Sequence, residues 1–141
     1  MQPTASDPDY PPGFIRTTGR QAPKLRLVVV EDDWRTHSAL RRVFTALGWE
    51  VESAMTVAGG LALLEGDPNG LIIDLKLPDG DGLDILRRVR LQGLRARVVV
   101  ATGVDDPDQI AAIRRLRPDA LVRKPVELDA VIRALGGEEP A

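Results

Sequence analysis

Short apolar runs alternate five times with segments of helical periodicity along most of this chain. The runs are rich in Val, Ile and Leu, which predicts strands at residues 25–30, 50–53, 71–74, 98–102 and 120–122. Apolar residues three or four positions apart predict helices within residues 40–47, 57–65, 83–90, 107–117 and 128–135. Strict alternation of strand and helix indicates parallel strands joined by right-handed crossovers.

The strands differ in a way that predicts their order in the sheet. Four runs are almost wholly apolar, as strands buried on both faces are, whereas residues 50–53 (Glu-Val-Glu-Ser) alternate like an edge strand. We therefore expect an α/β fold, a doubly wound five-stranded parallel sheet of order 2-1-3-4-5 with helices on both faces. Ligands of such sheets bind beyond the carboxyl ends of the strands.

Length and composition limit what else the chain holds. Its 141 residues suit one domain, which we place at residues 25–137. Residues 1–24 contain five prolines and few aliphatic residues, which predicts a disordered or loosely packed tail, and residues 138–141 form a short C-terminal tail.

Several classes of site are disfavoured by composition. The chain has no cysteine and one histidine, His37, which we expect at the surface, so thiolate and histidine-rich metal sites are excluded. A net charge of −2 does not favour nucleic-acid binding. No apolar run has the roughly 20 residues of a membrane span, and the N-terminus lacks a signal-peptide pattern. We therefore expect a cytoplasmic protein.

Charged and hydroxyl-bearing residues stand at or just past four of the predicted strands. In a parallel sheet these positions converge on one crevice although they are far apart in the chain. The residues are Glu31, Asp32, Asp33, Asp74, Thr102 and Lys124, and Pro125 directly follows the lysine.

Such a group suits phosphoryl transfer assisted by a metal. Carboxylates at close range repel one another unless a cation lies between them, and oxygen ligands without histidine or cysteine favour Mg²⁺. A lysine and a threonine at the same place supply donors for phosphoryl oxygens. Asp74 is the candidate nucleophile, since a carboxylate can form an aspartyl phosphate. Each residue taken singly is also explained as a helix cap or a solvated charge; their joint occurrence favours a site.

Four strings of this sequence resemble the response-regulator receiver domains, a family with a flavodoxin-like fold. They are LVVVEDD at 27–33, IIDLKLPDGDG at 72–82, VVATG at 99–103 and VRKP at 122–125. An acidic pair, an aspartate, a threonine and a Lys-Pro pair are specific in this order and spacing. The resemblance covers residues 25–137.

The resemblance implies a role for each matched residue. Asp74 is expected to accept the phosphoryl group, Thr102 to contact it through its hydroxyl and Lys124 through its ammonium. Pro125 is expected to be cis and to aim Lys124 into the site.

The resemblance also implies a magnesium cofactor. Asp32 is expected to bind Mg²⁺ directly, Glu31 through water, and the remaining ligands are Asp74 and the Lys76 carbonyl. The register of the acidic pair is open by one residue; we favour 31 and 32 because they directly follow the strand. Trp34 is either a packing residue or a rim residue of the crevice.

Some positions depart from the family pattern or modulate its chemistry. Leu121 stands where an aromatic switch residue is frequent, which predicts signalling without an aromatic rotamer change. Lys76 and Val104 are expected to flank the line of attack of hydrolytic water, and neither orients water well. The Lys76 side chain either covers the phosphoryl group or points to solvent.

The function implied is a receiver domain of a two-component phosphorelay, phosphorylated by a sensor histidine kinase or a histidine phosphotransfer protein. Such a domain catalyses only its own phosphotransfer and slow autodephosphorylation. Five residues follow Gly136, so we expect an unknown output partner and no attached effector, unless the chain is a piece of a longer regulator. A homodimer through the last-helix face stays open.

Two alternatives are kept. A haloacid-dehalogenase-like phosphatase shares the aspartyl nucleophile and Mg²⁺ but has an acid two residues after it, where this chain has Lys76. A scaffold that keeps the fold without phosphorylation is disfavoured by the complete set of site residues.

Overall fold

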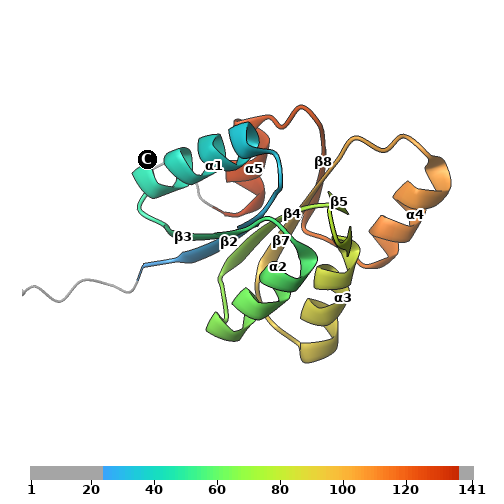
Figure 1. Cartoon of the computed structure of the whole chain (residues 1–141), viewed down its shortest axis with the longest axis horizontal. Helices are drawn as coiled ribbons and strands as arrows, with labels where there is room; N and C mark the ends of the chain where they lie inside the picture. The colour runs from blue at the N-terminus through green and yellow to red at the C-terminus, as the bar shows by residue number, and fades with distance from the viewer. Residues whose placement is uncertain (1–23, 137–141) are drawn as a thin grey trace, which may run out of the picture.

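Five parallel strands form the centre of the molecule, which is a computed structural model describing residues 24–136 (Figure 1). The predicted tails, up to residue 23 and from residue 138, lie outside the described residues. The strands are β2 (Arg26–Val30), β3 (Glu50–Ala54), β4 (Gly70–Asp74), β7 (Arg97–Thr102) and β8 (Ala120–Arg123). Their order is β3-β2-β4-β7-β8, which confirms the predicted order 2-1-3-4-5.

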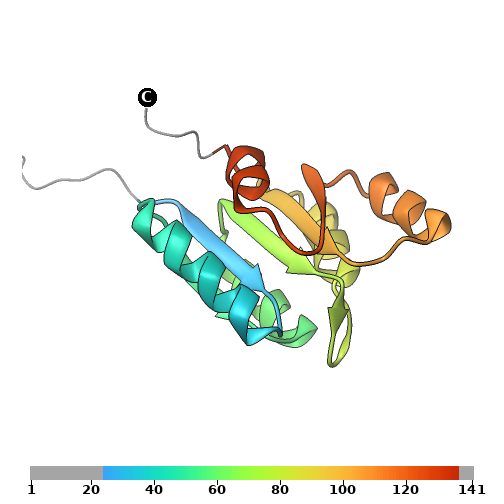
Figure 2. The same cartoon turned by 90° about the horizontal axis from the view of Figure 1, so that it is seen from above.

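Helices cover both faces of this sheet. Figure 1 shows α1 and α5 above the sheet and α2 and α3 below it, and Figure 2 shows α4 on the side of the molecule opposite α1. The helices are α1 (Trp34–Ala46), α2 (Val57–Leu63, continued by a 3₁₀ turn at Leu64–Gly66), α3 (Leu83–Gln92), α4 (Pro107–Arg115) and α5 (Leu128–Ala134). The doubly wound α/β architecture is therefore confirmed.

Alternating residues of the strands form two separate cores. Val28, Val30 and Ile73 pack toward α2, α3 and α4, while Leu27 and Val29 pack toward α1 and α5. These side chains are fully buried, and each contributes about 1.5–3 kcal/mol by leaving water. Burial on both faces explains why these strands read as continuous apolar runs.

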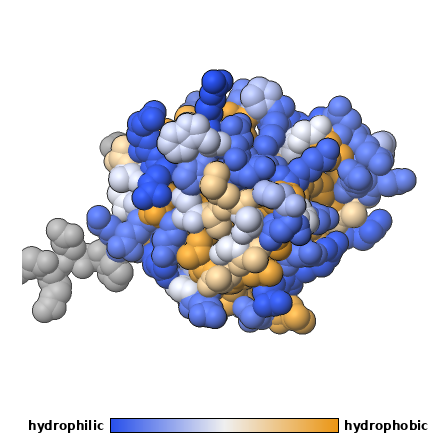
Figure 3. All heavy atoms as spheres, viewed as in Figure 1, coloured by the Kyte–Doolittle hydropathy of each residue, from blue (hydrophilic) through white to orange (hydrophobic). Residues whose placement is uncertain are grey.

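Helix α2 packs very closely on the sheet. A Cβ at Gly60 would lie 2.7 Å from Ile85 Cδ1 and 2.9 Å from Val30 Cγ2. Glycine lowers the helix propensity of this segment, yet the close approach of α2 to β2 requires it. Apolar residues gather over the lower centre of the space-filling view, where Figure 1 places α2 and α3 (Figure 3).

A small hairpin follows β4. Strand β5 (Lys76–Leu77) pairs with β6 (Gly80–Asp81) in antiparallel register. The sequence predicts a loop at residues 78–82, and that expectation is wrong for residues 80–81, which form β6. Two-residue strands give no detectable periodicity, which is why the pattern could not show them.

Candidate functional site

Strand register brings the predicted site residues level with one another. Val30 lies opposite Ile73, so Glu31 and Asp74, each one residue further, are neighbours at the carboxyl edge. On the other side of β4, Asp74 lies opposite Ala101. Lys124 follows directly on the last strand of the sheet.

Three carboxylates meet at this edge. One oxygen each of Glu31, Asp32 and Asp74 lies within 4.8 Å of the others. Glu31 is 2% and Asp74 5% exposed, whereas Asp32 faces solvent. Two buried acids with one exposed acid form a concentrated negative site that is open on one side.

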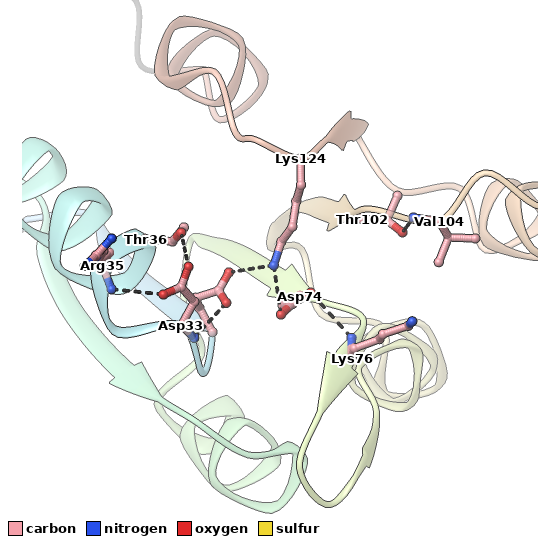
Figure 4. Close-up of polar contacts among 9 residues, drawn as sticks. Asp33, Arg35, Thr36, Asp74, Lys76, Thr102, Val104 and Lys124 are labelled. Atoms are coloured by element: carbon pink, nitrogen blue, oxygen red, sulfur yellow. Dashed lines mark hydrogen bonds and ion pairs between the residues drawn. The ribbon is translucent and has the colours of Figure 1, made fainter.

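Asp33 serves a different purpose. It is the N-cap of α1, where its Oδ1 accepts a hydrogen bond from the Arg35 amide at 3.2 Å and its Oδ2 one from the Thr36 hydroxyl at 3.0 Å (Figure 4). Among the described residues the three-carboxylate group thus consists of positions 31, 32 and 74.

Lys124 reaches into the carboxylate group from the loop after β8. Its Nζ lies 3.1 Å from Asp74 Oδ2 (Figure 4) and 3.4 Å from Glu31 Oε1. Partial burial alone lowers the pKa of Lys124, but the hydrogen bond and charge of Asp74, with those of Glu31, outweigh it and raise the pKa. Lys124 is therefore held charged beside the acids. The Lys124–Pro125 peptide bond is cis, as the resemblance implied.

The buried carboxyl of Glu31 loses its proton less readily than an ordinary glutamate carboxyl does. Burial raises its pKa to about 6, and the neighbouring Asp74 charge adds to the rise. The Asp33 amide, which donates to Glu31 Oε2 at 2.9 Å, and Lys124 oppose it. A further cation at this position would favour the ionised form.

The hairpin after β4 carries Lys76 next to the acids. The Lys76 amide donates to Asp74 Oδ1 at 3.4 Å, while its side chain extends away from that carboxylate (Figure 4). The sequence leaves two positions open for the Lys76 side chain, over the phosphoryl group or toward solvent. The observed direction corresponds to the second.

Gly82 allows the backbone to close tightly around Asp74. A Cβ at Gly82 would lie 2.1 Å from the Asp74 carbonyl oxygen, and the Gly82 amide donates to the Leu75 carbonyl at 2.8 Å. Sequence reasoning placed Gly82 in the loop without this role. The signal available was a glycine at the N-cap position of α3, where a residue with a capping side chain is usual.

Thr102 and Val104 line the opposite wall of the site. Thr102 is 1% exposed, and its hydroxyl oxygen accepts the Val104 amide at 2.9 Å (Figure 4). A pocket of about 370 Å³ opens here, large enough for a phosphoryl group and several waters. Its lining consists of Asp32, Asp74, Leu75, Lys76, Thr102, Gly103, Val104 and Lys124.

Other predicted residues lie around the site. Leu121 is partly buried against the core beneath α2, α3 and α4. Trp34 is 67% exposed at the start of α1, and its ring centroid lies 6.4 Å from that of the partly buried His37. The alternative that Trp34 packs into the core is therefore wrong.

Known proteins resemble this chain over most of the part that the structure describes. The family model of the response regulator receiver domain matches residues 27–136 of this sequence. The acid tolerance regulatory protein ActR of Rhizobium meliloti is 34% identical over 116 residues, which cover 80% of this chain and 59% of that protein. The photosynthetic apparatus regulatory protein RegA of Rhodobacter capsulatus is 31% identical over 110 residues, 77% of this chain and 60% of that protein.

A solved structure shows the same fold. The CheY-like response regulator receiver domain protein from Methanospirillum hungatei superposes with a TM-score of 0.73 at 26% identity, covering 82% of this chain and 96% of that one. The chain spans about 60% of the length of the two curated relatives above. Within the described part, no helix is both long and apolar enough to span a bilayer. With the family model matching most of the folded chain, this protein belongs to the response regulator receiver domain family.

Proposed function

We propose that Asp74 accepts a phosphoryl group from a phosphohistidine, carried by a sensor histidine kinase or a histidine phosphotransfer protein. The observation that supports this most directly is the position of Asp74, buried between two further acids and Lys124. The sequence favours a phosphoacceptor over a phosphatase that turns over, because the residue two positions after Asp74 is Lys76 and not an acid.

The acids fit a hard divalent cation. Three carboxylates, with one exposed to solvent, offer few protein oxygens and leave room for waters, which is the coordination Mg²⁺ prefers. We assign the ligands as Asp32 directly, Glu31 through water, Asp74 and the Lys76 carbonyl. When bound, Mg²⁺ would neutralise negative charge on the carboxylates and the phosphoryl oxygens.

The chain's own residues then account for the transfer. An Asp74 oxygen forms a bond to phosphorus while the phosphorus–nitrogen bond of the donor breaks, and the electron pair leaves with the histidine nitrogen. Lys124 pairs with Asp74 and Glu31 in the unphosphorylated chain and would pair with a phosphoryl oxygen after the transfer. The Thr102 hydroxyl accepts from Val104 and still has its own hydrogen to donate.

The output of the domain follows from the same site. Phosphorylation adds charge and acceptor oxygens next to Thr102, so the loop after Thr102 is the first segment that would rearrange. We propose that the rearranged surface docks an output partner, and that the domain itself does not contact nucleic acid. Self-association through the α5 face stays a prediction from the sequence.

One experiment separates the proposal from its alternatives. The full chain is incubated with a small phosphoramidate and Mg²⁺, and intact mass is followed with time. We expect one acyl phosphate per chain, which disappears slowly and forms only with the metal. Continuous release of inorganic phosphate at high turnover would indicate a phosphatase, and the absence of any adduct would indicate a scaffold.

A further inference from the structure

The carboxylate of Asp79 joins two elements that are separate in the chain. Asp79 lies in the turn of the hairpin formed by β5 and β6, and its two oxygens accept the first backbone amides of α2. The Val57 amide donates to Oδ1 at 2.7 Å and the Ala58 amide to Oδ2 at 3.0 Å. These hydrogen bonds lower the pKa of Asp79, and the one from the Ala58 amide has the larger effect. The carboxylate is therefore ionised at neutral pH.

Helix α2 already has a cap of its own. The Thr56 hydroxyl accepts the Gly59 amide at 2.9 Å, in the usual manner of an N-cap. The two caps act on the same helix end but differ in what they connect. Thr56 is contiguous with α2, whereas Asp79 ties α2 to the hairpin that carries Lys76.

The base of the hairpin is fixed separately. Leu75 and Leu77 are buried in the same core cluster as Val57, the Gly82 amide donates to the Leu75 carbonyl at 2.8 Å, and Lys76 pairs with Asp81 across the two-residue strands. At its far end the Leu83 amide donates to Asp81 Oδ1 at 2.9 Å. The exposed turn between β5 and β6 is thus held onto the body of the molecule by the Asp79 carboxylate.

We propose that Asp79 is a positioning residue for the metal site: by fixing the hairpin on α2 it holds the Lys76 backbone beside Asp74. This inference rests on the proposed function, which gives the Lys76 carbonyl to Mg²⁺. Asp79 is not itself a ligand, because both of its oxygens are occupied by amides of α2. Outer partners that orient metal ligands commonly change metal affinity by about 10- to 100-fold when removed.

The test compares Asp79→Ala with Thr56→Val in the full chain. Each variant loses a cap of α2, but only Asp79→Ala releases the hairpin. After treatment with a chelator, Mg²⁺ is titrated by isothermal calorimetry. We expect Asp79→Ala to bind Mg²⁺ about tenfold more weakly than the parent, and Thr56→Val to bind like the parent. Asp79→Asn, which keeps one acceptor oxygen, should lie between the parent and Asp79→Ala.

A second readout needs no metal. Amide hydrogen exchange at Lys76 and Leu77 should be faster in Asp79→Ala and Asp79→Asn, and unchanged in Thr56→Val. If Asp79→Ala does not fold, Asp79→Asn carries both measurements. Equal Mg²⁺ affinity in the parent and the Asp79 variants would overturn this inference and leave the proposed function standing. An equal loss of Mg²⁺ affinity in the Asp79 and Thr56 variants would do the same. A parent chain that binds no Mg²⁺ and accepts no phosphoryl group would overturn the proposed function and the inference with it.

Discussion

Asp74 is the residue on which the proposed chemistry depends. Its carboxylate lies at the carboxyl end of a fully buried strand and contacts Lys124. Replacement by asparagine keeps the shape and one acceptor oxygen but removes the nucleophile. We expect Asp74→Asn to fold like the parent and to lose all labelling by phosphoramidate, as measured by intact mass. Labelling of the variant at the parent's level would refute the assignment.

Glu31 gives the stability of the metal-free chain a dependence on pH. Its pKa in the folded chain is about 6, above the ordinary value of 4.5, so the folded state binds this proton more tightly than the unfolded state. Its contribution to the free energy of unfolding therefore increases as pH falls from above 6 to below 4.5.

Glu31→Gln removes this dependence. Without metal at pH 7.5, we expect the variant to be more stable than the parent by on the order of 1 kcal/mol, because one pKa unit corresponds to about 1.4 kcal/mol. Urea unfolding of both chains at pH 7.5 and 4.5 measures the difference, which should shrink at the lower pH. A difference independent of pH would contradict the role given to burial of Glu31.

We predict that the lifetime of the acyl phosphate depends on Lys76 and Val104. Neither side chain carries a carboxylate or amide suited to orienting a water molecule for in-line attack, and the Lys76 side chain extends away from Asp74 (Figure 4). We expect slow autodephosphorylation in the parent. Lys76→Asn combined with Val104→Glu should shorten the lifetime by about tenfold, or about 1.4 kcal/mol of barrier. Decay is followed by intact mass after removal of the phosphoramidate, and an unchanged or longer lifetime would refute the hypothesis.

Among the elements, α4 is attached unevenly. At its C-terminal end, Arg90 of α3 donates to the Leu116 carbonyl at 3.0 Å and to the Arg117 carbonyl at 2.6 Å. A pocket of about 520 Å³ opens between α3, the hairpin and the middle of α4, lined on the α4 side by Gln109, Ala112 and Ile113. Residues 107–109, the first turn of α4, are exposed. The N-terminal turn of α4 is therefore the part with room to move.

This asymmetry predicts where activation appears. Beryllofluoride, which mimics the phosphoryl group, should change amide chemical shifts most at residues 103–110 and least at residues 114–117, near Arg90. Leu121 offers no aromatic ring, so the repacking beside Thr102 should be aliphatic. Arg90→Ala should extend the changes to the end of α4. Shift changes confined to α1 and α5 would count against this view.

The elements show what the sequence could and could not predict. The strands, their order and the residues directly past them were predictable, because strand periodicity and parallel topology place those residues without knowledge of side-chain contacts. The hairpin at 76–81 and the Asp79 contact were not, because two-residue strands have no period and the partners of Asp79 lie more than twenty residues away. Exposure of Trp34 was left undecided, since a helix's first residue belongs to neither face by pattern alone.

At the scale of the whole molecule, Mg²⁺ binding should stabilise the fold. A ligand that binds only the folded state adds RT ln(1 + [L]/Kd), which is about 1.4 kcal/mol at ten times Kd. We expect the melting temperature to rise with Mg²⁺, to return after a chelator is added, and to be insensitive to Mg²⁺ in Asp32→Ala. Fluorescence of Trp34 in a Trp49→Phe background should follow the same titration. A melting temperature indifferent to millimolar Mg²⁺ in the parent would contradict a metal site here.

The two kinds of site residue are segregated along the chain. The acids that would hold the cation all lie at or directly after the ends of β2 and β4, whereas the hydroxyl and ammonium that would hold the phosphoryl group lie at or directly after the ends of β7 and β8. Gly93, in a left-handed conformation (φ +66°) with open space around it, lies on the connection between these halves. A chain cut there would leave one fragment with the metal-binding acids and the nucleophile but without the hydroxyl and ammonium that contact the phosphoryl group. The other fragment would hold this hydroxyl and ammonium but no nucleophile. Labelling of Asp74 by phosphoramidate would then report that the two fragments had reassociated.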